Sequence, residues 1–267
     1  MESELNVNTS IVDGPGFQIS LDGPIATILF NRPPANTIDP ELIEALIAAL
    51  PSVTENREIR CIVISGSGNA FIGGADIRVM RELKPATYRA MRRWIEVQEL
   101  LEYAPKPVIA ALNGHTLGGG AELALACDLR ILHKAATFGF PESRLGIFPG
   151  AGGSQRLPRL LGIHQAKRMI MNGDRLNAED ALAHGLVDII ADDDFNSVVG
   201  AEARRLSELP TATIGLIKQV IVDGQHLPLA DALDLEEDAV MANLALEDAA
   251  EGLQAFLDKR KAVFTGK

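Results

Sequence analysis

The segment LGGGAELALACD, residues 117–128, joins a glycine-rich turn to a predicted helix. It follows a short apolar run, 107–112, which predicts a buried strand, and Asn113-Gly114 predicts the turn that ends it. The glycines leave room for a ligand beside the helix start, where backbone N–H groups lack partners and carry partial positive charge. Glu122 lies one helical turn later among Leu and Ala residues. Because an unpaired carboxylate is costly to bury, the segment predicts a site that combines anion-stabilising N–H groups with a titratable side chain.

Outward from this segment, strands and helices alternate. Asp22-Gly23-Pro24 predicts the turn of a hairpin, and Asp39-Pro40 predicts a helix start with proline in its first turn. The predicted elements are hairpin strands over 17–21 and 25–30, a helix over 40–50, a strand over 59–65, a helix over 78–104, and strands over 128–133 and 136–140. This alternation indicates the α/β class.

The chain changes character after Gly150, because nearly every later segment predicts a helix. In the longest, over 227–257, one apolar face is formed by residues at helical spacing, namely Leu229, Leu233, Val240 and Leu244. We therefore expect an α/β core over residues 1–200, followed by a helical region over 201–267 that mediates oligomerisation.

Composition limits the class of function. The chain has 267 residues, 47% hydrophobic and 23% charged, which suits a globular protein with a sizeable core. Its net charge of −11 argues against a nucleic-acid-binding surface. No apolar run approaches the ~20 residues of a membrane-spanning helix, so no membrane partner is expected. The segment 1–10 lacks the apolar stretch of a signal peptide, and Cys61 and Cys127 indicate no disulfide framework, so we expect a cytoplasmic location.

A second carboxylate, Glu142, follows Phe140-Pro141, where the proline ends a predicted strand. The next segment, 149–153, is rich in glycine and proline and suits either a tight connection or the lining of a ligand site. Simpler interpretations stay open, because the helix dipole favours a carboxylate such as Glu122 and a loop glutamate can pair with an arginine. Asp76 fits an N-cap better than a catalyst. Spacing alone does not bring the two glutamates together.

Other catalytic motifs do not match. The run GSGNAF, 66–71, lacks the third glycine of a dinucleotide-binding fingerprint, and no phosphate-binding loop ends in Gly-Lys-Ser/Thr. The run GGSQR, 152–156, lacks the last glycine of a nucleophile elbow. The five histidines show no zinc spacing, so we expect no metal.

Several motifs nevertheless occur together and in order, namely AFIGGADI over 70–77, NGHTLGGGAEL over 113–123, Pro141-Glu142 and GAGGSQRL over 150–157. In this combination the chain resembles the crotonase (enoyl-CoA hydratase/isomerase) superfamily over most of its length. The resemblance implies a spiral of repeated ββα units with a helical C-terminal trimerisation region. It also implies a homotrimer or, more usually, a homohexamer made of two trimers.

The resemblance further implies a coenzyme A thioester as substrate and no separate cofactor. It places the oxyanion hole at the backbone N–H groups of Ala75 and Gly119, and the catalytic pair at Glu122 and Glu142. By family analogy Glu142 is the acid at the α-carbon and Glu122 the base that orients water, although the reverse and a shared role stay open.

Retention of both glutamates favours one branch of the superfamily. Hydratases keep both, whereas isomerases and other branches often lose one, so we expect an enoyl-CoA hydratase of fatty-acid or related acyl-CoA degradation. The alternatives are an enoyl-CoA isomerase and a hydratase of a branched or ring-bearing enoyl-CoA. An RNA-binding homologue is a third alternative, which the net charge of −11 disfavours.

The resemblance also suggests residues that bind the substrate. Many hydratases carry a lysine near the CoA phosphates after an Arg-Pro pair, where this chain has Pro34. The expected replacements are Arg32, Arg78 and, from a neighbouring subunit, Lys259. Ala35, Gly74 and Asp76 complete the expected CoA-binding residues. The acyl pocket is expected to be apolar, with contributions from Ile77, Met80, Leu117, Phe140 and Phe256.

Overall fold

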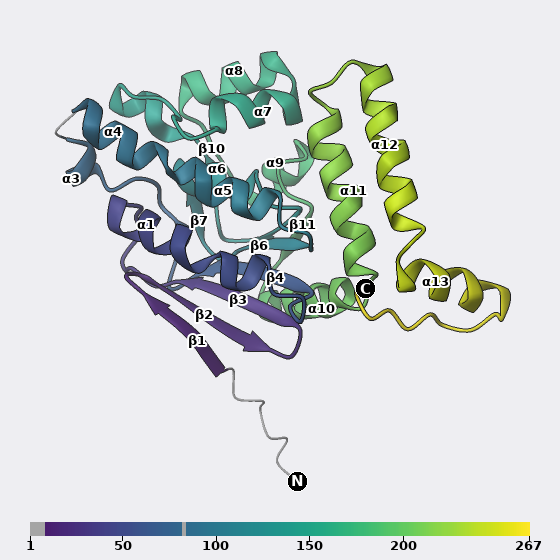
Figure 1. Ribbon diagram of the computed structural model, residues 1–267. Helices are drawn as coiled ribbons and strands as arrows, with labels where there is room; N and C mark the ends of the chain where they lie inside the picture. The colour runs from purple at the N-terminus through teal and green to yellow at the C-terminus, as the bar shows by residue number, and fades with distance from the viewer. Residues whose placement is uncertain (1–8, 82–83) are drawn as a thin grey trace, which may run out of the picture.

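The computed structural model describes residues 9–81 and 84–267, and within these ranges the chain forms a seven-stranded and a four-stranded β-sheet (Figure 1). The larger sheet has the order β1-β2-β3-β4-β6-β8-β11. It begins as an antiparallel meander and becomes parallel from β3 onward. Its strands are β1 (Thr9–Gly14), β2 (Phe17–Asp22), β3 (Ile25–Phe30), β4 (Cys61–Gly66), β6 (Val108–Leu112), β8 (Leu129–His133) and β11 (Ile189–Ala191). The predicted hairpin, β2 with β3, is confirmed.

The smaller sheet has the order β10-β9-β7-β5 and consists of very short strands. They are β5 (Ala70–Ile72), β7 (His115–Leu117), β9 (Phe138–Gly139) and β10 (Arg175–Leu176). Except for β9, which lies within the predicted strand 136–140, the sequence analysis missed them. Two or three residues are too few to show the alternation by which a strand is recognised.

A strand of the larger sheet, a strand of the smaller sheet and a helix follow one another repeatedly along the chain. β4 and β5 lead to α3 (Ile77–Met80), β6 and β7 lead to α6 (Gly119–Ala124), and β8 and β9 lead to the 3-10 helix η1 (Pro141–Leu145). The expected ββα units are therefore present. Because parallel neighbours β5, β7 and β9 end at the same edge of the smaller sheet, the three helix starts come together there.

The remaining core helices cover these sheets. They are α1 (Pro40–Ala49), α2 (Pro51–Thr54), α4 (Pro85–Arg92), α5 (Trp94–Glu102), α7 (Gly153–Leu161), α8 (Ile163–Asn172), α9 (Ala178–Ala183) and α10 (Phe195–Ser207). A continuous helix over 78–104 was wrong, because α3, α4 and α5 are separate, with Pro85 starting α4. Part of this predicted helix, 82–83, lies outside the described residues.

The C-terminal region is helical, as expected. α11 (Thr211–Gly224) and α12 (Leu229–Asn243) lie side by side, and α13 (Glu247–Leu257) extends away from the core (Figure 1). A continuous helix over 227–257 was wrong, because the chain turns at 244–246 between α12 and α13. The four apolar residues of the predicted face are all more than half exposed, namely Leu229, Leu233, Val240 and Leu244. The division at residue 200 falls within α10 and stays a prediction.

The main hydrophobic core lies between the two sheets and helices α1 and α5. Phe30 packs edge-on against both Phe71 and Trp94, and all three are buried. A second cluster, around Phe195 and Val199 of α10, covers the other face of the larger sheet. In the described part of the chain, no helix has the length and apolarity needed to cross a membrane. Residues 1–8, from which we predict no signal peptide, lie outside the described ranges.

Candidate active site

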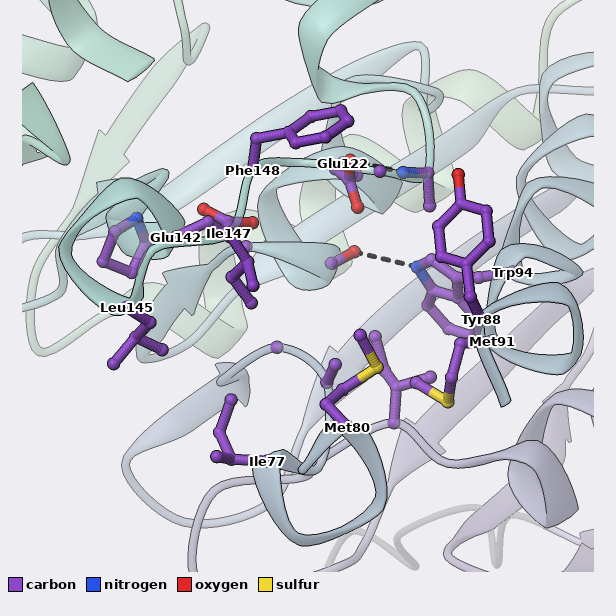
Figure 2. A pocket seen from close by; sticks show the side chains of 18 of the residues that line it. Ile77, Met80, Tyr88, Met91, Trp94, Glu122, Glu142, Leu145, Ile147 and Phe148 are labelled. Carbon is purple, nitrogen blue, oxygen red and sulfur yellow. Dashed lines mark hydrogen bonds between the residues drawn. The ribbon is translucent and has the colours of Figure 1, made fainter. Parts of the chain in front are cut away.

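The helix starts at the edge of the smaller sheet surround a cavity of about 690 Å³ (Figure 2). The turns that precede α3 and α6, η1 with the loop 145–151, and helices α4 and α5 provide its walls. Glu122 and Glu142 both line this cavity, although they are 20 residues apart in sequence (142 minus 122). The fold therefore brings together the two carboxylates that the sequence pattern could not place relative to one another.

Glu122 lies in the first turn of α6 and is almost completely buried. Its Oε1 accepts N–H hydrogen bonds from Ala151 and Gly153, each 2.9 Å long. Gly153 is the first residue of α7, so the carboxylate also lies at the positive end of that helix. Since both bonds go to Oε1, Oε2 is the oxygen left for a ligand in the cavity.

Glu142 lies in the first turn of η1, directly after Pro141. Its Oε2 is buried and has no hydrogen-bond partner within 9–81 and 84–267. Its Oε1 lies beside the Cα atom of Gly118, in the glycine turn that precedes α6. A buried acceptor without a partner is unusual and costly, so this carboxyl group is arranged for a ligand or for a proton.

Burial raises the pKa of both carboxyl groups, because it disfavours their charged forms. For Glu142 the pKa reaches about 7, and the nearby negative charge of Glu122 adds to the effect of burial. At Glu122, the N–H groups of Gly153 and Ala151 and the charge of Arg156 counteract part of the rise. The two groups therefore differ, since N–H groups of two other residues support the ionised form of Glu122, whereas only its own backbone N–H supports the ionised form of Glu142.

The predicted oxyanion donors, Ala75 and Gly119, lie on the same cavity. The N–H of Ile38 donates to the carbonyl of Gly74 at 2.9 Å, and the carbonyl of Ile38 accepts the N–H of Asp76 at 2.7 Å. The N–H of Ala75, which lies between these two groups, therefore points to the opposite side. Gly119 is the first residue of α6, where N–H groups have no partner in the helix. Neither N–H donates to another group of the described chain.

The three glycines of the turn are closely packed against other parts of the site. A Cβ atom at Gly118 would lie 2.8 Å from Oε1 of Glu142, one at Gly119 2.6 Å from the Ile38 side chain, and one at Gly120 2.2 Å from the Ile72 carbonyl oxygen. Gly118 also has φ of +53°, a conformation that residues with a side chain rarely adopt. A side chain at Gly120 would collide with backbone, whereas one at Gly118 or Gly119 would displace the side chain of Glu142 or Ile38.

The other predicted residues divide into two groups. Gly74, Ile77, Met80 and Leu117 line the cavity, as expected. Phe140 does not, because it is fully buried behind the site and packs edge-on against Phe138. In its own subunit, neither Phe256, which is 81% exposed on α13, nor Lys259 after that helix lines the cavity.

The predicted CoA-binding residues of the N-terminal half are engaged with one another or with the backbone. Arg32 binds Asp39, and the carbonyl of Ala35 accepts the N–H of Gly73 at 2.8 Å. Asp76 caps α3 through the N–H of Arg78, as its pattern favoured, and its carboxylate binds the exposed Arg78 guanidinium at 2.8 Å. That hydrogen bond holds the pKa of Asp76 below its usual value.

Residues of α4 and α5 that the sequence analysis missed also shape the site. Tyr88, Met91 and Trp94 line the cavity, and the Trp94 indole N–H donates to the Gly119 carbonyl at 2.9 Å (Figure 2). Gln98, one turn further along α5, is fully buried and donates to the Ala151 carbonyl at 2.8 Å. The signal in the sequence was the spacing of four residues, which places Trp94 and Gln98 on one helix face. This spacing does not identify their partners.

Comparisons with known proteins show which family the chain is similar to over nearly its whole length. Residues 21–267 match the family model described as enoyl-CoA hydratase/isomerase. The chain is 38% identical over 247 residues to a crotonyl-CoA hydratase of Syntrophomonas wolfei, covering 91% of this chain and 95% of the other. It is 35% identical to a short-chain-enoyl-CoA hydratase of Clostridium acetobutylicum, covering 90% and 94%. The crystal structure of an enoyl-CoA hydratase from Bacillus anthracis superposes with a TM-score of 0.89 at 34% identity, covering 95% and 100%.

Proposed function

We propose that the chain, which belongs to the enoyl-CoA hydratase/isomerase family, is an enoyl-CoA hydratase. It would add water across the double bond of a trans-2-enoyl-CoA and release a 3-hydroxyacyl-CoA, in the degradation of fatty acids or related acyl-CoA compounds. The observation that carries this proposal is the meeting on one cavity of the buried carboxylate of Glu122, the half-buried carboxylate of Glu142 and two backbone N–H groups without partners in the described chain. The similarity to relatives that are named as enoyl-CoA hydratases supports the proposal further.

Binding of the thioester begins the reaction. Its carbonyl oxygen accepts hydrogen bonds from the N–H groups of Ala75 and Gly119, which draws electron density away from the β-carbon. When water adds there, negative charge collects on the thioester oxygen, as in an enolate. Fixed N–H donors that point at developing charge contribute roughly 3–4 kcal/mol each to transition-state stabilisation. No separate cofactor and no metal take part in this scheme.

The two glutamates move the protons. Water bound between them loses a proton to Glu122, whose carboxylate is supported by the N–H groups of Ala151 and Gly153. Glu142 delivers a proton to the α-carbon. This role fits its pKa of about 7, because the carboxyl group then stays protonated at any pH below that value. Two neighbouring carboxyl groups with different surroundings thus divide the roles of base and acid.

The cavity walls and the C-terminal helices bear on substrate and assembly. The walls near α3 and α4 are mainly apolar, with Ile77, Met80 and Met91, which suits a hydrocarbon acyl group.

The exposed apolar residues of α12 favour association into a homotrimer or homohexamer. In such an assembly Lys259 of a neighbouring subunit would reach the CoA phosphates. We also keep the cytoplasmic location as a prediction.

The test is to follow the loss of the enoyl-thioester absorbance with trans-2-enoyl-CoAs from short to long chains. Hydration predicts rapid loss and a product heavier by one water, with oxygen from labelled water at C3. The Glu122→Gln, Glu142→Gln double variant provides the background rate. The optimal chain length would identify the natural acyl group.

Two outcomes would contradict the proposal. If no straight, branched or ring-bearing enoyl-CoA gains water while acyl-CoA still binds, the chain is not a hydratase. If a 3-enoyl-CoA shifts its double bond faster than any 2-enoyl-CoA is hydrated, it is an isomerase. In the second case deuterium from heavy water enters the substrate without a gain in oxygen.

A further inference from the structure

We propose that Gln98 is a positioning residue for Glu122, because it fixes the peptide between the two N–H donors that hold the Glu122 carboxylate. This inference rests on the proposed function, in which Glu122 is the base. Gln98 does not touch the cavity and has no place in the chemical steps above. Its effect is transmitted through the loop that precedes α7.

Gln98 contacts this loop at its centre, between the two N–H groups that bind Glu122. Glu122 accepts the N–H groups of Ala151 and Gly153, and the carbonyl of Ala151 belongs to the peptide between those two donors. Gln98 donates to that carbonyl at 2.8 Å. The loop is rich in glycine, so its backbone has many alternative conformations unless side chains from elsewhere restrict it. Release of this carbonyl would therefore free both donors at once.

The orientation of the Gln98 amide is itself determined. Arg156 donates to Gln98 Oε1 at 2.7 Å, and because a guanidinium can only donate, the amide oxygen must face Arg156. The amide NH₂ group then faces the Ala151 carbonyl. Glu102 holds the Arg156 guanidinium on its other side. A Cβ atom at Gly152 would lie 2.3 Å from Arg156 Nη1, so the loop backbone packs directly on this contact.

The contacts thus form a continuous chain from α5 to the carboxylate. Glu102 holds Arg156, Arg156 orients Gln98, Gln98 holds the loop, and the loop holds Glu122. Gln98 is fully buried, so water cannot take its place as a donor. A role of this kind affects where the Glu122 oxygens lie and how readily they ionise, and leaves the cavity walls unchanged.

The test replaces Gln98 by Glu and by Met. Gln98→Glu keeps the shape and the acceptor for Arg156 but removes the donor, whereas Gln98→Met removes both. We expect kcat for hydration to fall about tenfold or more, with KM changed less than threefold, because the base is misplaced while the substrate walls remain. Gln155→Glu, an exposed change of the same charge next to Arg156 on α7, is the control and should behave as the parent chain.

The pH profile separates positioning from a merely structural role. Weaker N–H bonds to Glu122 raise its pKa, so the acid limb of kcat should move upward in Gln98→Met, which adds no charge of its own near Glu122. A structural role would lower the active fraction and leave the profile of the remaining activity in place. Full kcat, or a reduced kcat with an unchanged acid limb, in well-folded variants overturns the inference.

Two further measurements keep the test decisive. If the Gln98 variants do not fold, Arg156→Lys, which keeps the cation and loses the fork, should give a smaller shift in the same direction, and no shift overturns the inference. If the parent chain hydrates no enoyl-CoA, the proposed function fails by itself. The distance from Ala151 N to Glu122 Oε1, 2.9 Å here, should still lengthen beyond hydrogen-bond range in a crystal structure of Gln98→Met. An unchanged distance contradicts the inference without reference to activity.

Discussion

Oε1 of Glu142 occupies the space that a side chain on Gly118 would need, because a Cβ atom built on Gly118 would lie 2.8 Å from that oxygen. Gly118 also accepts the N–H of Glu122 through its carbonyl at 2.9 Å and directly precedes Gly119, whose N–H faces the cavity. One glycine therefore adjoins the proposed acid, the proposed base and an oxyanion donor. The close approach of these groups depends on a position without a side chain.

The first prediction concerns this position. Gly118→Ala should reduce kcat about 10²-fold, because the methyl group displaces Glu142 by up to the ~1 Å that such a loss requires. Steady-state kinetics on the best enoyl-CoA measures the effect. Gly162→Ala is the matched control, since Gly162 also has positive φ but has open space around it. If both variants lose activity equally, backbone strain rather than contact with Glu142 is responsible.

The second prediction concerns the carboxylates themselves. Glu122→Gln and Glu142→Gln should each lower kcat at least ~10²-fold, the usual size of an acid–base contribution. The amide keeps the shape of each side chain but cannot carry the proton. Exchange of deuterium into the product α-carbon should also be lost in Glu142→Gln. Glu179→Gln, at an exposed position on α9, serves as control, and near-full activity in either site variant removes that residue from the mechanism.

The third prediction concerns stability and pH. The pKa of Glu142 is about 7 when folded against 4.5 for an ordinary glutamate, so the unfolded chain ionises first as pH rises. The free energy of unfolding should therefore fall between pH 4.5 and 7, by about 3 kcal/mol from this group. Glu142→Gln removes that loss.

Denaturation at pH 4 and pH 8 measures this effect. Relative to its difference from the parent near pH 4, where the carboxyl group is protonated in both states, the Gln variant should gain up to about 3 kcal/mol by pH 8, while its activity is lower. This pattern means that the site keeps a carboxyl group which the folded chain would be more stable without. If the Gln variant gains no stability relative to the parent between pH 4 and pH 8, ionisation of Glu142 does not lower the free energy of unfolding, and this prediction is wrong.

The fourth prediction concerns the exposed face of α12. Leu233→Glu should convert the oligomer to monomers, because it places a charge among apolar residues that we expect to be covered by another subunit. Light scattering measures the mass. Leu182→Glu, on an exposed leucine of α9, is the control. A monomeric parent chain would refute the assembly.

We expect assembly to determine how Lys259 acts. Because Lys259 does not line the cavity of its own subunit, Lys259→Ala should raise KM more than it changes kcat only in the assembled protein. The monomeric Leu233→Glu variant should then show no further change in KM when Lys259 is also replaced. A larger change in kcat than in KM would contradict a role in binding the CoA phosphates.

The sequence was most informative where chemistry and backbone geometry coincide. Gly118, Gly119 and Glu122 lie within a few residues of one another, so their pattern predicted a helix start with a carboxylate, and the structure has both. The division of the strands between two sheets was harder to predict from the sequence. β5 and β7 contain three residues each, and their place in a second sheet depends on partners far along the chain.

Residues that act through distant contacts could not be predicted. Trp94 meets Gly119 across 25 positions and Gln98 meets Ala151 across 53, and nothing local indicates either partner. Phe140 illustrates the opposite error, since an apolar residue two positions before the proposed catalytic Glu142 can pack into the core rather than the cavity. Apolar character predicts burial, but it does not say against which surface.

The packing of the glycine turn also limits how such a chain can diverge. Gly118, Gly119 and Gly120 are closely packed, whereas the walls of α3, α4 and the loop 145–148 consist of ordinary side chains that can be exchanged one by one. If the proposed function holds, reaction and substrate preference are encoded on different stretches of the sequence. A lineage could then change the acyl group it accepts by drift in those walls, while the turn proposed to carry the addition of water keeps its glycines.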